Sequence, residues 1–155
     1  MSPPASLPPG VVPALLSALH LLGLGIGLAA VYARGRALRG AVDVPAVLRA
    51  DNWWGVAAIL WWSTGLLRAF GGYEKGTAFY LGSPFFLAKM AVLGLLVLLE
   101  LWPMVTFIRW RVLQARGRPL DLSGARRLRV INSIEVALTA LMPLLASLMA
   151  RGVGR

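Results

Sequence analysis

The sequence predicts an all-α protein, an integral membrane bundle of four antiparallel transmembrane helices that forms a single domain over residues 1–155. Three observations predict this fold. The chain is 58% hydrophobic with a mean hydropathy of +0.72, and only 14% of its residues are charged, against about a quarter in soluble domains. Its apolar residues fall into four blocks, each near the roughly 20 residues that cross a hydrocarbon core. Most basic residues lie between these blocks.

The first predicted helix covers residues 11–33. Pro13 falls in its first turn, where no amide hydrogen bond is lost, and Gly40 is suited to end a helical extension beyond the membrane. Gly23 and Gly27 form a small-xxx-small pair, which permits close approach of another helix. The block is too long for the apolar core of a signal peptide, so we expect it to remain in the mature protein.

The second and third predicted helices cover residues 52–70 and 84–107. Either Asp43 or Asp51 can cap the second helix. A short external loop, rich in glycine and aromatic residues, is expected to join the two helices over residues 71–83.

The fourth predicted helix covers residues 130–150, with Asp121 or Ser123 as its cap. Its polar residues recur at three- and four-residue steps, which places them on one stripe: Asn132, Glu135 and Thr139. A polar stripe of this kind is expected to face the bundle rather than lipid.

The distribution of positive charge predicts the orientation. Eleven of the 16 Lys and Arg residues lie in the predicted loops 34–51 and 108–129, so the positive-inside bias makes both loops cytoplasmic and both termini external. The net charge of +10 therefore reflects topology, and we expect no nucleic-acid partner. The expected partners are the lipid bilayer and either a second copy of the chain or another membrane protein.

Five ionisable residues lie inside the predicted spans: His20, Arg68, Lys89, Glu100 and Glu135. Each charge at a helix centre costs about 2.5–3.5 kcal/mol, so each needs a partner or a function. Lys89 and Glu100 are eleven residues apart and share one helix face. We expect Glu100 to face the Asn132/Glu135/Thr139 stripe, with one carboxyl protonated or held by an arginine. Arg36 and Arg109 are the expected counter-charges.

Several of these residues can also be explained by a structural role, without any function in binding or catalysis. Arg68 and Lys89 are close enough to the external surface to snorkel, and Glu135 can pair with Arg109 or Arg129. His20 is the only histidine, and a hydrogen bond to a neighbouring helix explains it as well as a function does.

Some chemistry is excluded by composition. One histidine and no cysteine provide no ordinary zinc site and no disulfide, and a bis-histidine dihaem cytochrome would need four histidines. We therefore predict no metal site and assign no catalytic residues, and whether the protein is an enzyme stays open.

Four segments carry a resemblance to known proteins: residues 19–25, 49–55, 68–84 and 89–111. They resemble a bacterial membrane-protein family that is catalogued as a domain of unknown function. The resemblance implies a four-helix protein of the bacterial inner membrane and names no activity.

The chain is also distantly similar to the HemJ-type protoporphyrinogen oxidases. The similarity rests on His20 with Arg36 after the first helix, and on Phe85, Phe86 and Lys89 at the start of a later helix. It implies haem b as a cofactor between His20 and Lys89. Further histidines typical of those oxidases are absent.

Three functions follow as alternatives. The first is a haem-binding or redox-active membrane protein that uses His20 and Lys89. The second is a small ion- or proton-coupled transporter component that uses Lys89, Glu100 and Glu135. The third is an accessory membrane subunit without catalytic activity.

Overall fold

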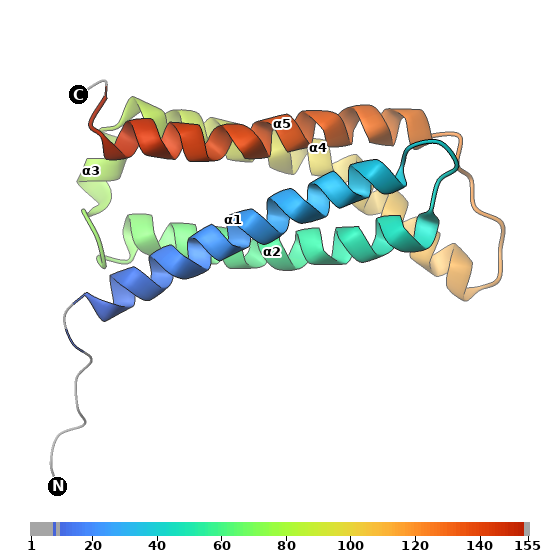
Figure 1. Cartoon of the computed structure of the whole chain (residues 1–155), viewed down its shortest axis with the longest axis horizontal. Coiled ribbons are helices and arrows are strands. Elements are labelled where there is room, and N and C mark those ends of the chain that lie inside the picture. The colour runs from blue at the N-terminus through green and yellow to red at the C-terminus, as the bar shows by residue number, and fades with distance from the viewer. Residues whose placement is uncertain (1–7, 9, 154–155) are drawn as a thin grey trace, which may run out of the picture.

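The computed structural model describes residue 8 and residues 10–153. These residues form four long helices and one short helix: α1 (Val11–Ala37), α2 (Val44–Phe70), α3 (Thr77–Leu81), α4 (Pro84–Ala115) and α5 (Ala125–Ala150). The long helices lie side by side, and the chain reverses direction at alternating ends of the molecule (Figure 1). The prediction of an all-α protein is confirmed. The two termini themselves lie outside the described residues.

Three of these helices are long and apolar enough to cross a membrane. They are α1, α4 and α5, whose best windows have mean hydropathies of 2.1, 2.2 and 1.7. α2 is as long as α1, at 27 residues, but its charged residues and tryptophans lower its mean hydropathy. The structure thus describes a membrane protein with three candidate spans.

α1 continues beyond its predicted span to Ala37, as the expected helical extension before Gly40 requires, and the other long helices also extend at the end where residues 38–43 and 116–124 connect them. α2 begins at Val44 instead of residue 52, because Asp43 caps it by accepting a hydrogen bond from the Ala46 amide at 3.0 Å. Asp51 therefore lies inside α2. Apolar runs mark the membrane-embedded part of a helix, whereas the helix itself continues to its cap.

The start of α5 and the external loop also differ from the predictions. α5 begins after Gly124 without a side-chain cap, and Asp121 instead accepts from the Ser123 amide at 2.9 Å. Residues 71–83 were expected to form a loop only, yet they contain α3.

α1 packs along α2 at small residues, as the glycine pair predicted. A Cβ atom at Gly23 would lie 3.0 Å from the Trp61 backbone nitrogen, and one at Gly27 would lie 3.4 Å from the Cβ of Ala57. Only glycine allows the two backbones to come this close at Gly23.

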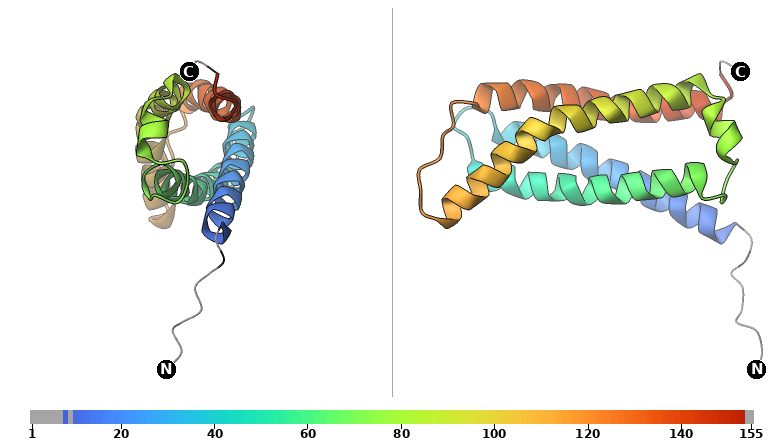
Figure 2. Two further views of the ribbon diagram at one scale, coloured as in Figure 1. Left: turned by 90° about the vertical axis from the view of Figure 1, so that its left-hand side faces the viewer. Right: turned by 180° about the vertical axis from the view of Figure 1, so that it is seen from behind.

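The other pairs of long helices differ in how extensively they contact each other. α4 packs on α5 and α5 on α1, but α2 and α4 contact each other sparsely; Figure 2 shows the arrangement from the end and from behind. A buried apolar cluster fills the end near residues 38–43: Leu38, Val44, Val47, Leu48, Phe107, Trp110 and Leu128. Beyond this cluster the interior carries two polar regions separated along the bundle axis.

Candidate functional site

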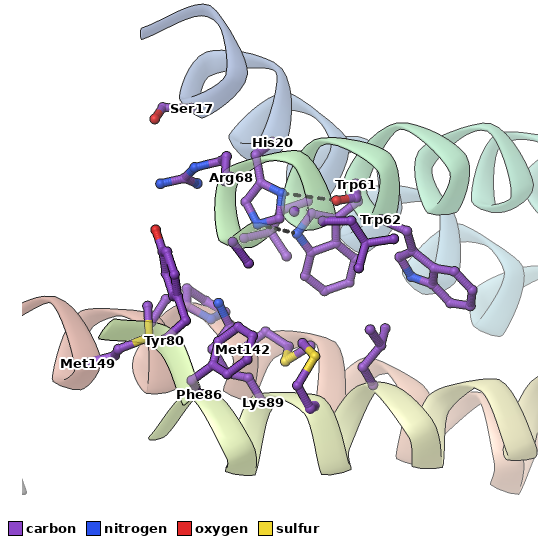
Figure 3. A pocket seen from close by; sticks show the side chains of 18 of the residues that line it. Ser17, His20, Trp61, Trp62, Arg68, Tyr80, Phe86, Lys89, Met142 and Met149 are labelled. Carbon is purple, nitrogen blue, oxygen red and sulfur yellow. Dashed lines mark hydrogen bonds between the residues drawn. The ribbon is translucent and has the colours of Figure 1, made fainter. Parts of the chain in front are cut away.

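The first polar region surrounds a cavity of about 440 Å³, here called the outer pocket, at the end of the bundle near α3. Figure 3 shows its two facing walls, with His20, Trp61 and Arg68 on one side and Phe86, Lys89 and Met142 on the other. The first wall comes from α1 and α2, and the second from α4 and α5. The volume lies within the range of about 300–1,000 Å³ that is typical of small-molecule sites.

His20 has both ring nitrogens engaged by α2. Its Nδ1 lies 3.0 Å from the Trp61 carbonyl oxygen, and its Nε2 lies 3.1 Å from the Trp61 indole nitrogen. The carbonyl can only accept and the indole can only donate. His20 therefore carries its proton on Nδ1 and accepts at Nε2. Gly65 leaves room for the ring, since a Cβ there would lie 3.0 Å from the His20 Cε1 atom.

Lys89 lines the opposite wall of the outer pocket. Its ammonium group has no hydrogen bond or ion pair with any residue that the structure describes. Most of the surrounding wall is apolar and includes three methionines, Met90, Met142 and Met149, whose side chains adapt to differently shaped ligands. Lys89 is thus a cation in an apolar cavity without a counter-charge.

Arg68, by contrast, is neutralised at the rim of the outer pocket. Its Nε donates to Glu74 Oε1 at 2.6 Å, and the Tyr80 hydroxyl donates to Glu74 Oε2 at 2.6 Å. Ser17 donates to Glu74 Oε1 at 3.3 Å. Glu74 thereby ties α1, α2 and α3 together at this end of the bundle.

The rim residues outside the long helices have shifted pKa values. Burial opposes the charged form of Glu74, but hydrogen bonds from Arg68 and Tyr80 outweigh it and lower the pKa of the carboxyl. Burial and the hydrogen bond to Glu74 raise the pKa of Tyr80 to about 12. Glu74 was not among the predicted site residues, although it is the only acidic residue between Asp51 and Glu100.

The second polar region, here called the inner cluster, is centred on Arg34 of α1, whose side chain is only 1% exposed. All five N–H groups of its guanidinium have acceptors. Nε donates to Asn132 at 2.8 Å, and the other two nitrogens donate to Glu100 at 2.8 and 2.9 Å, to Glu135 at 2.6 Å and to Asp51 at 3.0 Å. Arg34 therefore joins α1, α2, α4 and α5.

Asp51 links this buried group to the end of the bundle. Its second oxygen accepts from Arg111 of α4 at 2.7 Å, and the Arg111 side chain is 34% exposed. The inner cluster thus contains three carboxylates, Asp51, Glu100 and Glu135, and two guanidinium groups. If all five were ionised, it would carry one net negative charge.

Two buried atoms near the inner cluster have no partner. Glu135 Oε1 and Thr139 Oγ1 make no hydrogen bond with the residues that the structure describes, and both side chains are 0% exposed. Glu135 and Thr139 lie one turn apart on the same face of α5, since side chains four residues apart are neighbours on a helix.

A second cavity of about 270 Å³, the inner cavity, lies between α2 and α4 where these helices hardly touch. Asp51 and Glu100 reach its wall, together with Trp54. Trp61 and Trp62 line both this cavity and the outer pocket, so the two tryptophans separate them.

The predicted site residues therefore divide between two places. His20, Arg68 and Lys89 line the outer pocket, and Glu100, Asn132 and Glu135 meet in the inner cluster with Thr139 one turn away. Lys89 and Glu100 share α4 but belong to different regions.

The predicted counter-charges for the carboxylates were wrong. Arg36 and Arg109 are exposed, and Arg34 takes their place. Arg34 is seven residues from Gly27, two helical turns along the face that packs on α2, and this spacing is the signal that would have identified it.

The outer pocket does not fit haem b held between His20 and Lys89. The His20 Nε2 atom, which would ligate iron, already accepts a hydrogen bond from Trp61, and Nδ1 carries the proton. The chain has no other histidine and no cysteine that could replace it. Among the described residues, no group of three or more His, Cys, Asp or Glu side chains is arranged to hold a metal ion.

Comparisons with known proteins identify the family. Residues 12–154 match the family described as "Predicted membrane protein (DUF2214)". No curated protein and no solved structure matches the chain, and the similarity to HemJ-type oxidases has no support among these results. Because the match covers nearly the whole sequence, the chain belongs to DUF2214, a family of predicted membrane proteins of unknown function.

Proposed function

We propose that the chain is a four-span protein of the bacterial inner membrane whose outer pocket binds a lipophilic monoanion, an apolar molecule with one acidic group. The observation that carries this proposal is Lys89, a cation in a mostly apolar cavity that forms no hydrogen bond or ion pair with any described residue. Binding is the function that this cavity supports, since both ring nitrogens of His20, the residue best suited to act as a base, are held by Trp61.

The fourth span would be α2. From residue 52 to residue 67 it has no charged side chain, and its outward face carries apolar residues such as Val56 and Ile59, which are 51% and 74% exposed. Its charged residues lie near its ends, where Asp51 and Arg68 have partners within the protein. With the basic loops cytoplasmic, consecutive spans run antiparallel and both termini are external.

The chemistry of the outer pocket favours an anion over a cation or a neutral molecule. Arg68 is already bound to Glu74, so Lys89 is the group left to bind an acid. The hydrogen bonds of His20 to Trp61 leave the ring as a neutral part of the wall. A carboxylate or phosphate head on Lys89 would gain a charge-assisted hydrogen bond, and the apolar tail would contact the methionine- and leucine-lined surface.

The proposal can be tested by titrating the purified protein with decanoate, decanol and decylamine, with tryptophan fluorescence as the readout. Trp61 and Trp62 line the outer pocket and should report binding. Decanoate should bind most tightly. Lys89→Met should weaken decanoate binding about tenfold or more, because a hydrogen bond to a charged group contributes about 1.5–3 kcal/mol, while decanol binding should be unchanged.

Lys75→Met is the matched control, since the Lys75 amine stacks on Phe79 at 4.4 Å outside the pocket. It should leave all three affinities as in the wild type. Equal binding of decanoate by the wild type and the Lys89→Met variant would refute the anion site.

The haem prediction is tested by reduced-minus-oxidised spectroscopy of protein expressed with a haem precursor. A Soret band lost in both His20→Ala and Lys89→Ala would replace our proposal with the redox function.

A further inference from the structure

The inner cluster, which is separate from the outer pocket, contains a carboxylate whose two oxygens differ sharply. Glu135 Oε2 accepts from Arg34 at 2.6 Å. Glu135 Oε1 is buried and has no donor among the described residues. An ionised carboxylate oxygen that is removed from water and lacks a donor is destabilised, so Oε1 is the atom of the cluster where a proton is most favourable.

The charge balance supports the same assignment. The charged groups that face one another here are Arg34 of α1, Asp51 of α2, Glu100 and Arg111 of α4, and Glu135 of α5. Three carboxylates against two guanidinium groups leave one negative charge. A single bound proton makes the five groups neutral together, which is the favourable state in a low-dielectric interior.

Thr139 supplies an independent observation. Its hydroxyl oxygen is fully buried and has no hydrogen-bond partner within the described part of the chain, and it lies one helical turn from Glu135 towards the outer pocket. A protonated Glu135 Oε1 becomes a donor, and the Thr139 oxygen is a buried acceptor on the same face. Neither residue lines the outer pocket or the inner cavity, so the site suits a proton rather than a larger ion.

We propose that Glu135 and Thr139 form an exchangeable proton-binding site in the middle of the bundle. Glu100 provides the exchange route. It binds the same Arg34 nitrogen as Glu135, and it reaches the inner cavity with its side chain 19% exposed. In an exchange step the O–H bond of Glu135 breaks, an O–H bond forms on the Glu100 carboxylate, and the proton then passes to water in the inner cavity.

Infrared spectroscopy of the purified protein in lipid tests the site. A protonated carboxyl has a carbonyl stretch above the amide region that shifts slightly in D₂O. The wild type at pH 7 should show this band, and Glu135→Gln should lack it. Glu74→Gln removes a carboxylate outside the inner cluster and should retain the band. Asp51→Asn and Glu100→Gln each remove one negative charge from the cluster and should therefore weaken it, and the band that remains should exchange with D₂O at least about tenfold more slowly in Glu100→Gln.

Several outcomes would overturn the proposal. These are the absence of the band in the wild type, or a band of equal intensity in Glu135→Gln. If that variant does not fold, Thr139→Val provides the test. Loss of the hydroxyl acceptor should shift the carbonyl band of Glu135, and an unshifted band would refute the site. A band that disappears with NaCl but not with KCl at constant pH would show that sodium occupies the site instead. Wild-type exchange in Glu100→Gln would refute the route.

Discussion

Glu100 holds the guanidinium of Arg34 with both carboxylate oxygens, at 2.8 and 2.9 Å, although the two residues lie 66 positions apart in the chain. This bidentate pair joins α1 to α4. The same guanidinium binds Asp51, Asn132 and Glu135, so one side chain connects all four long helices.

Replacement of Arg34 by lysine should therefore destabilise the bundle severely. Lysine has three donors and cannot reproduce the planar fork of five N–H groups, so buried carboxylates lose their partners, at a cost of about 3–5 kcal/mol. Chemical unfolding in detergent, followed by circular dichroism, measures the loss. Arg36→Lys, at an exposed position two residues away, is the control and should be neutral. Equal stability of the two variants would contradict the central role of Arg34.

The close packing of α1 on α2 predicts different effects at two glycines of the same helix. Gly23→Ala places a Cβ 3.0 Å from the Trp61 backbone, and the overpacking should cost about 1–3 kcal/mol. Gly25→Ala meets no atom within 4 Å and should be neutral or slightly stabilising, because alanine favours helix. The melting temperatures of both variants, measured in the same detergent, test this difference. Similar melting temperatures would mean that the two helices do not pack as closely as described.

The network around Glu74 predicts a pH-dependent stability of the end of the bundle that carries α3. The folded pKa of Glu74 lies below its ordinary value of 4.5. The stabilisation that ionised Glu74 contributes to the fold is therefore complete above about pH 4.5, and it is lost as the pH falls through the lowered pKa of the folded state. The difference in melting temperature between wild type and Glu74→Gln should shrink over that range. If the difference in melting temperature stays constant as the pH falls, Glu74 is not the group that makes the stability depend on pH.

Cysteine labelling tests whether α2 crosses the membrane. The chain has no cysteine, so single substitutions report without background. An impermeant maleimide added to intact spheroplasts should label Tyr73→Cys but not Arg39→Cys or Arg118→Cys, which should react only after lysis. Labelling of Arg39→Cys and Tyr73→Cys from the same side would show that α2 does not span. Labelling of Arg118→Cys from outside would reverse the orientation.

Sequence patterns anticipated much of the interior. The three- and four-residue steps of Asn132, Glu135 and Thr139 correctly placed these residues on the buried face of α5, because a helix presents such positions on one side whatever its neighbours are. Glu100 was correctly expected to meet that stripe. His20 and Lys89 were expected at one pocket, and both line it.

The partners of these residues were harder to predict. Arg34 lies in a run with Arg36 and Arg39 that is typical of a cytoplasmic loop, and only its seven-residue spacing from Gly27 marks it as the arginine that points inward. Glu74 lies in a glycine-rich segment between apolar blocks, where its bond to Arg68 depends on how residues 71–76 fold back.

The sequence by itself determined the membrane class, the helical fold and the polar face of α5, because hydropathy, charge position and periodicity are local properties of the chain. Only the tertiary structure decided that Arg34 pairs with the buried carboxylates. It also decided that, among the residues it describes, Lys89, Glu135 Oε1 and Thr139 Oγ1 have no partner. Those facts depend on which atoms of distant helices come within hydrogen-bond distance. That distance is set by packing at positions such as Gly23, where α1 and α2 meet.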